Sequence, residues 1–413
     1  MSFVKDSVNR KPIVDTVFAI VDQAKKAKEE LGAENVTDAV IGSLYTEDGV
    51  LCAFDTVFST LKSLDNKKLA KYAVSFTGNP DFQEDVLDWV LDGNSDLYSD
   101  LYKEVIATPG GTGAVGMSIE NCLEAGQTLI IPEIAWGSYS LMAQMHNLKT
   151  KSYSLFEGDH FNLDSLKATC KAVMEEQDRL VLIINDPCQN PTGYSMTRKE
   201  WEDVIEFLNE CSKTHSVVLI NDIAYIDFAY EGAKAKEYFR CFDKISDDVA
   251  VIVAFSISKS LTSYGLRCGA AILMAKTQEG VDELKVVFEK TARATWSNVN
   301  NGAMETFSTI MRTKKDEYLA EKQKYVDLLK ARSDLFVKQA EEAGLVHYPY
   351  KEGFFVTLAM DNDKCDRLHA ALMENQIYTV KVNKGIRIAV CSMPLHVIDG
   401  LAARIKAVED QLD

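Results

Sequence analysis

The central part of the chain alternates between short apolar runs and longer segments with helical periodicity. The runs at 180–184 and 249–255 are continuously apolar, which is typical of strands covered on both faces of a sheet. Residues 197–212 begin with an S/T-x-x-E capping pattern and place apolar side chains at helical spacing. Strands that alternate with helices over residues 100–275 predict an α/β fold, with a mostly parallel sheet flanked by helices.

The remaining residues predict a second, smaller unit. Residues 304–343 are charge-rich and predict a long, solvated connecting helix, beyond which shorter strands and helices follow. The first 45 residues lack the alternating pattern, so we expect them to pack on the C-terminal part. We therefore predict a large domain of residues 46–310 and a smaller α+β domain formed by both termini, residues 1–45 and 311–413.

The charge and the cysteine pattern exclude several classes of function. The chain carries 45 Lys and Arg against 62 Asp and Glu, a net charge of −17, which repels nucleic-acid phosphates. No apolar run approaches the roughly 20 residues of a membrane-spanning helix, and residues 1–6 show no signal-peptide pattern. Nine Cys and six His are scattered without metal-ligand spacing. We expect a cytoplasmic protein with free thiols, no metal, and no nucleic-acid or membrane partner.

A lysine placed directly after a predicted buried strand is the strongest candidate for chemistry. Lys259 follows the run at 249–255. A buried ammonium is costly, so such a lysine can have a lowered pKa and react as a nucleophile with a carbonyl. Ser256, Ser258 and Arg267 add donors for an anionic group such as a phosphate. Alone, Lys259 would be interpreted as an exposed loop residue, but its neighbours favour the chemical interpretation.

The pattern S-x-S-K-x4-Y-G-x-R-x-G at 256–269 resembles the pyridoxal-phosphate lysine signature of class I aminotransferases. These are fold type I enzymes, and the aspartate and aromatic-amino-acid subgroup is the most similar. The resemblance implies that Lys259 holds pyridoxal phosphate covalently and acts as the catalytic base.

Other segments resemble further motifs of the subgroup in the same order along the chain. They are the glycine-rich turn at 108–114, the strand and Trp-Gly segment at 131–138, Asn-Pro-Thr-Gly at 190–193 and Asp-x-Ala-Tyr at 222–225. The resemblance implies that the phosphate is bound by Gly110, Gly111, Thr112, Ser256, Ser258 and Arg267, and the ring by Trp136, Asn190, Asp222 and Tyr225. A carboxylate such as Asp222 would keep the pyridine nitrogen protonated, which makes the ring an electron sink. Tyr139 stands where close relatives usually carry His.

The resemblance also implies how substrate is bound. Arg387, in an apolar strand pattern at 385–390, would bind the substrate α-carboxylate in a bidentate way, with Gly42 beside it. Arg293 would come from the neighbouring subunit to bind a distal carboxylate. An equally weighted alternative is that Arg293 is an ordinary surface residue at the end of a helix. Tyr72 would reach the phosphate across the same interface. Both residues imply a homodimer with active sites at the subunit interface.

We therefore predict an aminotransferase that moves an amino group between an amino acid and a 2-oxo acid such as 2-oxoglutarate. The amino acid would be aspartate, glutamate or aromatic. One alternative is another pyridoxal-phosphate reaction on the same fold, such as β-elimination or decarboxylation. A second is a non-catalytic ligand-binding regulator, although the chain has no spare DNA-binding domain and no basic patch.

Overall fold

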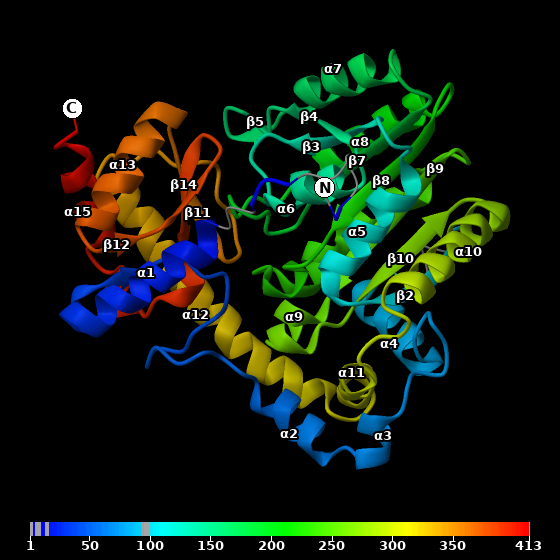
Figure 1. The fold of residues 1–413 in the computed structure, drawn as a ribbon, viewed down its shortest axis with the longest axis horizontal. Helices are drawn as coiled ribbons and strands as arrows, with labels where there is room; N and C mark the ends of the chain where they lie inside the picture. The colour runs from blue at the N-terminus through cyan, green and yellow to red at the C-terminus, as the bar shows by residue number, and fades with distance from the viewer. Residues whose placement is uncertain (1–2, 5–9, 13–15, 93, 95–99, 413) are drawn as a thin grey trace.

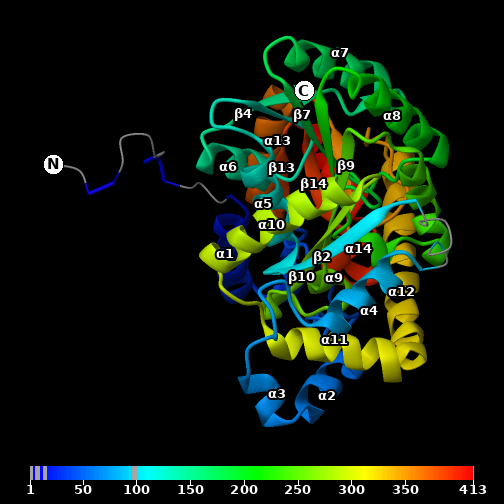
Figure 2. The same ribbon diagram turned by 90° about the vertical axis from the view of Figure 1, so that its right-hand side faces the viewer.

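A seven-stranded sheet forms the centre of the molecule, with helices on both faces (Figures 1 and 2). The computed structural model describes residues 3–4, 10–12, 16–92, 94 and 100–412. The strand order is β2-β10-β9-β8-β7-β3-β4. The strands are β2 (Tyr102–Thr108), β3 (Thr128–Pro132), β4 (Lys149–Tyr153), β7 (Arg179–Asn185), β8 (Ser216–Asp222), β9 (Val249–Ser256) and β10 (Gly269–Ala275).

The prediction of a mostly parallel sheet is confirmed. The pairs β3–β4, β3–β7, β7–β8 and β8–β9 are parallel, whereas β10 is antiparallel to both of its neighbours, β2 and β9. The turn that joins β9 to β10 contains Lys259. Parallel strands place their carboxyl ends at one edge of the sheet, where open α/β sheets bind ligands.

Two apolar cores explain why the middle of β7, residues 180–184, is apolar at every position. Leu180, Leu182 and Ile184 face one core, and the intervening Val181 and Ile183 face the other. The first core is covered by α4 (Pro80–Val90), α7 (Leu163–Met174) and α8 (Arg198–Cys211), and the second by α5 (Gly110–Cys122), α6 (Ser138–Met145) and α10 (Gln278–Thr295). Side chains alternate between the faces of a strand, so both faces must be apolar.

A second, three-stranded antiparallel sheet lies beside the large one (left in Figure 1), in the order β11-β14-β13. The strands of this sheet are β11 (Phe355–Ala359), β13 (Val380–Val382) and β14 (Gly385–Ala389). Together with the helices α13 (Asn362–Glu374), α14 (Leu395–Ile398) and α15 (Leu401–Glu409) they form a second unit. The N-terminal α1 (Thr16–Leu31) packs on this unit, and β1 (Thr37–Asp38) pairs with β12 (Ile377–Tyr378). Among the described residues, those from α1 onward thus pack on the C-terminal unit, while the domain boundaries remain a prediction.

The predicted helix at 304–343 is two helices, α11 (Asn301–Thr313) and α12 (Lys315–Glu342), which are separated at Lys314. The expectation that this segment is solvated is wrong for one side of α12, where Phe336 and Arg332 are fully buried. The buried side of α12 is hard to recognise in the sequence, because the many lysines and glutamates that face solvent dominate the composition of the helix. The buried residues recur among them at helical spacing.

The remaining elements are short. They are α2 (Asp55–Ser63), α3 (Asn66–Ala70), α9 (Ile257–Ser260), β5 (Phe156–Glu157), β6 (His160–Phe161) and the 3₁₀ helices at Ala33–Asn35, Ile226–Phe228, Gly232–Lys244, Tyr264–Leu266 and Val390–Ser392. Within the described ranges, no helix combines the length and the apolar character that crossing a bilayer requires.

The capping pattern before α8 forms as predicted and can be tested. The Glu200 N–H donates to Thr197 Oγ1 at 3.2 Å, and the Thr197 N–H donates to Glu200 Oε2 at 2.6 Å. We expect Thr197→Ala to lower the free energy of unfolding by about 1 kcal/mol, because an N–H of the first helical turn loses its acceptor. Urea unfolding measures the change, and Thr197→Ser, which keeps the oxygen, is the control. Equal stability of the two variants would contradict the capping role.

Candidate active site

A cavity of about 210 Å³ lies at the carboxyl edge of the large sheet. Most of the predicted cofactor residues line it: Gly111, Thr112, Trp136, Asn190, Asp222, Tyr225, Ser256, Ser258, Lys259 and Arg267. Asn185, Asp222 and Ser256 are the last residues of β7, β8 and β9. The sheet thus brings together side chains from segments that are far apart in the sequence.

Lys259 reaches into this cavity from α9, directly after β9. Its Nζ donates to the Gly42 carbonyl at 2.9 Å and lies 4.7 Å from the centre of the Tyr264 ring and 5.6 Å from that of Tyr225. In the described part of the chain it forms no ion pair. A lysine held by a carbonyl and two aromatic rings keeps a defined direction without a counter-charge.

The electrostatic surroundings make the Lys259 amine a weak base. Burial lowers its pKa to about 8, because the charged form loses hydration. The Cys391 thiol opposes this shift, whereas the positive charges of Arg387 and Arg267 add to it. The neutral, nucleophilic amine is therefore abundant close to physiological pH.

Asp222 is a buried carboxylate that has hydrogen bonds but no cationic partner among the described residues. The Tyr139 hydroxyl donates to Oδ2 at 2.7 Å, and the Ala224 N–H donates to Oδ1 at 3.0 Å. Burial raises the pKa of Asp222, and these two hydrogen bonds oppose the rise. A protonated nitrogen beside Asp222 would compensate its charge.

Two residues at this end of the cavity were not assigned from the sequence. Tyr139, which holds Asp222, is fully buried on α6. Asn185 donates to the Asp222 carbonyl at 2.8 Å and accepts from the Asn190 N–H at 2.7 Å. The sequence feature that could have identified Asn185 as a site residue is its position immediately after the apolar run at 180–184, where the strand was expected to end.

The other end of the cavity is a cradle for an anion. Gly110 has a φ of +75°, and a Cβ there would lie 2.5 Å from an Arg267 nitrogen, so glycine is required. Arg267 donates to the Ser258 hydroxyl at 2.9 Å. Gly111 packs against Ser256, and α5 begins at this point. Guanidinium, hydroxyl and helix N-terminal N–H groups together suit a phosphate. Gly110 itself shapes the turn and does not line the cavity.

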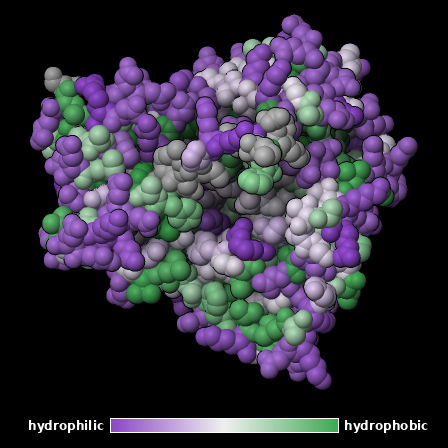
Figure 3. All heavy atoms as spheres, viewed as in Figure 1, coloured by the Kyte–Doolittle hydropathy of each residue, from purple (hydrophilic) through white to green (hydrophobic). Residues whose placement is uncertain are grey.

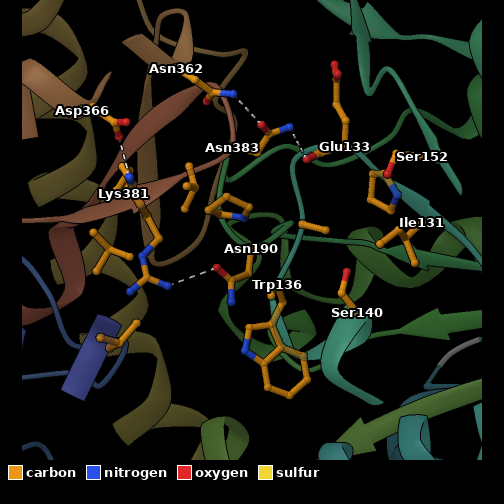
Figure 4. Close-up of a pocket in the computed structure, with 18 residues that line it drawn as sticks. Ile131, Glu133, Trp136, Ser140, Ser152, Asn190, Asn362, Asp366, Lys381 and Asn383 are labelled. Carbon is orange, nitrogen blue, oxygen red and sulfur yellow. Dashed lines mark hydrogen bonds and ion pairs between the residues drawn. The ribbon is translucent and has the colours of Figure 1, made fainter. Parts of the chain in front are cut away.

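A second, larger cavity of about 660 Å³ continues from the first, and Trp136 and Asn190 line both. Figure 4 shows Asn190 above the Trp136 indole at the inner end of this outer cavity. Across its mouth, Asn383 donates to the Glu133 carbonyl at 2.9 Å, and Lys384 forms a 2.7 Å ion pair with the Glu133 carboxylate (Figure 4 draws the first bond). The cavity thus lies between the large and the small sheet.

Arg387 from β14 contributes a buried positive charge to the outer cavity; it is only 8% exposed. Nη2 donates to the Val40 carbonyl at 2.7 Å, and the guanidinium lies 4.2 Å from the centre of the Phe355 ring. Nε is buried without an acceptor in the described structure, where Arg387 also has no carboxylate partner. Gly42 packs so closely on Phe355 that a Cβ would lie 2.7 Å from its ring. Nη1 donates to Asn190 Oδ1 at 3.4 Å, so Nε is the guanidinium nitrogen without an acceptor among the described residues. A carboxylate ligand would supply an acceptor to this guanidinium.

Tyr72 and Arg293 are not brought to this site within the chain. Tyr72 is 82% exposed, and Arg293 donates to the Ser297 hydroxyl and stacks over Phe76 at 5.0 Å. Three apolar side chains close to Tyr72 in the sequence are also exposed: Leu69, Val74 and Phe76. Figure 3 shows apolar side chains gathered on the lower part of this face, near α2 and α11.

The family described as aminotransferase class I and II matches residues 43–405. The chain belongs to this family. Membership confirms the predicted fold class, aminotransferase activity and pyridoxal-phosphate cofactor. Nothing in the comparisons favours the alternatives of elimination, decarboxylation or a non-catalytic regulator.

Individual aminotransferases resemble this chain over much of its length. An aspartate aminotransferase of Salmonella typhi is 25% identical over 273 residues, which cover 66% of this chain and 67% of that protein. A crystal structure of an aminotransferase from Anaerococcus prevotii DSM 20548 has a TM-score of 0.94 at 32% identity and covers 98% of this chain and 99% of its own. A crystal structure of an aromatic-amino-acid aminotransferase from Burkholderia pseudomallei, covalently bound to pyridoxal phosphate, has a TM-score of 0.80 at 20% identity. The match covers 99% of this chain and 100% of that chain.

The residues of this aminotransferase fit the cofactor by their chemistry. Lys259 offers an amine for covalent attachment, and Asp222 is a buried carboxylate that lacks a cation. The cradle around Arg267 offers donors to a phosphate at the other end of the cavity. The roles of the individual residues remain predictions.

The lowered pKa of Lys259 predicts an unusual pH dependence of its reactivity. In protein stripped of cofactor, we expect acetylation of Lys259 to reach half of its maximum near pH 8, because the protonated amine predominates only below that value. The same lysine in urea-unfolded protein should show a midpoint about two units higher, near the ordinary pKa of roughly 10.4. Mass spectrometry after short pulses of acetic anhydride measures both. Identical midpoints in folded and unfolded protein would contradict the burial effect.

Proposed function

We propose that this aminotransferase transfers the amino group of aspartate, glutamate or an aromatic amino acid to a 2-oxo acid such as 2-oxoglutarate. The observation that carries the proposal is Arg387, a buried guanidinium with an unsatisfied Nε at the cavity that adjoins Lys259. An α-carboxylate bound there would place the α-carbon of the substrate toward the Lys259 amine. Amino acids and 2-oxo acids share this carboxylate, so one site serves both.

Each group of side chains has a separate task in the proposed mechanism. When bound, pyridoxal phosphate supplies an electron sink for the substrate α-carbon. The Lys259 amine holds the cofactor and, once free, takes the proton from the α-carbon and returns it. Asp222, oriented by Tyr139, would keep the ring nitrogen protonated. The indole of Trp136 would stack on the ring. Asn190 and Tyr225 would also hold the ring, and the phosphate would be held by Gly111, Thr112, Ser256, Ser258 and Arg267.

The choice between dicarboxylic and aromatic substrates depends on Arg293 in this proposal. Lys381, which lines the outer cavity, is already paired with Asp366, and the neighbouring Lys384 is paired with Glu133. A distal carboxylate would therefore need another cation, and Arg293 of a second subunit would supply it. An aromatic side chain would instead contact the apolar part of the cavity wall.

We also propose a cytoplasmic homodimer with its active sites at the subunit interface. Exposed apolar surface on a soluble chain marks interaction surfaces. Leu69, Val74 and Phe76 are exposed and lie near Tyr72 in the sequence, and Arg293 stacks over Phe76. A two-fold contact there would bring these residues to the partner's cavity. The proposed domains are residues 46–310, and residues 1–45 with 311–413.

The chemistry predicts two separable half-reactions. The holoenzyme mixed with an amino acid alone should release one 2-oxo acid per subunit and turn over further only after 2-oxoglutarate is added. Lys259→Ala should lower turnover about a thousandfold or more, because the proton-transfer base is lost. Lys213→Ala, which removes an exposed lysine far from the cavity, is the matched control. Release of carbon dioxide, or of ammonia together with repeated turnovers of 2-oxo acid in the absence of an acceptor, would contradict transamination.

The dimer predicts that active sites can be rebuilt from two defective subunits. We expect Arg293→Ala to lower kcat/KM for aspartate roughly a hundredfold, because a distal carboxylate loses its charged partner, and to affect tyrosine less. Differently tagged Lys259→Ala and Arg293→Ala chains are co-expressed and the mixed dimer is purified. It should contain one complete site and recover about half of the wild-type kcat with aspartate. If the mixed dimer stays inactive, or if Arg293→Ala leaves aspartate kinetics untouched, Arg293 does not act across an interface.

A further inference from the structure

A fully buried arginine lies outside both cavities, on α12. The Arg332 side chain is 0% exposed, and it lines neither the inner nor the outer cavity. A buried guanidinium is costly unless its N–H groups find acceptors. Its acceptors therefore show which parts of the chain it holds in place.

The guanidinium of Arg332 binds two separate segments at once. Nη1 donates to the Tyr45 carbonyl at 2.8 Å and to the Cys391 carbonyl at 3.0 Å. Nε and Nη2 donate to the same oxygen of Glu47, at 3.0 and 2.6 Å. The Glu47 carboxylate in turn accepts from the Leu395 N–H at 3.0 Å. Arg332 thus ties residues 45–47 to residues 391–395.

The first of these segments continues directly into the active site. The Val40 carbonyl accepts from Arg387, and the Gly42 carbonyl accepts from Lys259. The Leu44 N–H donates to the Tyr264 hydroxyl at 2.9 Å. Every one of these contacts lies within five residues of Tyr45, whose carbonyl Arg332 holds.

The second segment begins at the carboxylate-binding arginine itself. Arg387 lies on β14, and Cys391 follows four residues later, in the 3₁₀ helix that continues from this strand. The Tyr45 N–H donates to the Cys391 carbonyl at 3.0 Å, so the two segments are also joined directly. A shift of either carbonyl would change the separation of Gly42 and Arg387.

We propose that Arg332 is a positioning residue that fixes the Gly42 and Arg387 segments against each other and so sets the geometry of the substrate-carboxylate site. It acts through backbone carbonyls and touches neither substrate nor cofactor. The inference rests on the proposed function, which assigns the carboxylate to these two segments. Glu47 is 42% exposed, so the buried carbonyls are the part of the network for which water can least replace the guanidinium.

The test compares substrate binding with catalysis in Arg332→Gln holoenzyme. We expect the KM of both substrates to rise about tenfold or more while kcat stays within about threefold, because carboxylate binding is lost and the proton-transfer groups remain. The Kd of the 2-methyl analogue of the preferred amino acid, which has no α-hydrogen to lose, should rise in parallel in calorimetry. Val326→Ala, a buried apolar change on the same helix, is the control for lost stability alone.

Two outcomes would overturn the proposal. The first is an Arg332→Gln protein that, like Val326→Ala, unfolds at a lower temperature but keeps the wild-type KM and Kd. If Arg332→Gln does not fold, the Glu47→Gln variant provides the test, because this change only weakens charge-assisted hydrogen bonds. We expect its KM and Kd to rise about twofold to fivefold. Unchanged KM and Kd values in this variant are the second outcome that would overturn the proposal. A wild-type protein that binds the analogue but forms no 2-oxo acid would instead contradict the proposed function, and the Kd comparison would remain valid.

Discussion

The burial of unpaired charge at one edge of the large sheet is the constraint on which the rest of the structure depends. Lys259, Asp222 and Arg387 are each buried or nearly so, and none has an ion-pair partner in the described part of the chain. Removing such groups from water costs several kcal/mol per charge unless a partner restores the interaction. The site is therefore complementary to a ligand that carries a carbonyl, a basic ring nitrogen and carboxylates. The same free energy that destabilises the empty site becomes available for binding.

The rigid scaffold that holds these charges is the doubly covered sheet. Asn185 and Asp222 are neighbours in register at the ends of β7 and β8, and Ser256 ends the adjacent β9. Because the apolar residues of the central strands pack into two apolar cores, the strand ends cannot move independently. Asp222 and Ser256, two of the predicted cofactor residues, therefore lie at rigid strand ends, whereas Lys259 lies on α9 after β9 and Asn190 lies in the loop after β7.

The proposed substrate side is built differently, from backbone carbonyls of distant segments. Lys259 donates to Gly42 and Arg387 to Val40, contacts that span 217 and 347 residues of sequence. Residues 40–42 thus contribute acceptors to a site whose charged groups lie in the second half of the chain. The joint between these segments depends on Arg332 of α12 and on the pairing of β1 with β12. Closing such long loops costs entropy that only extensive packing can offset.

The sequence by itself determined the α/β fold, the capping box at Thr197, and the set of residues around Lys259. These features are encoded locally, in the period of apolar residues and in short motifs at strand ends. Tertiary structure decided which polar groups became partners: Tyr139 with Asp222, Asn185 with Asn190, and Arg332 with Tyr45 and Cys391. It also split the helix expected at 304–343 and left Tyr72 and Arg293 on the surface. The physical reason is that periodicity reports which face of an element is buried. The acceptor of a buried donor is instead chosen by how separate segments pack, and in the case of Arg332 and Tyr45 these segments lie 287 residues apart.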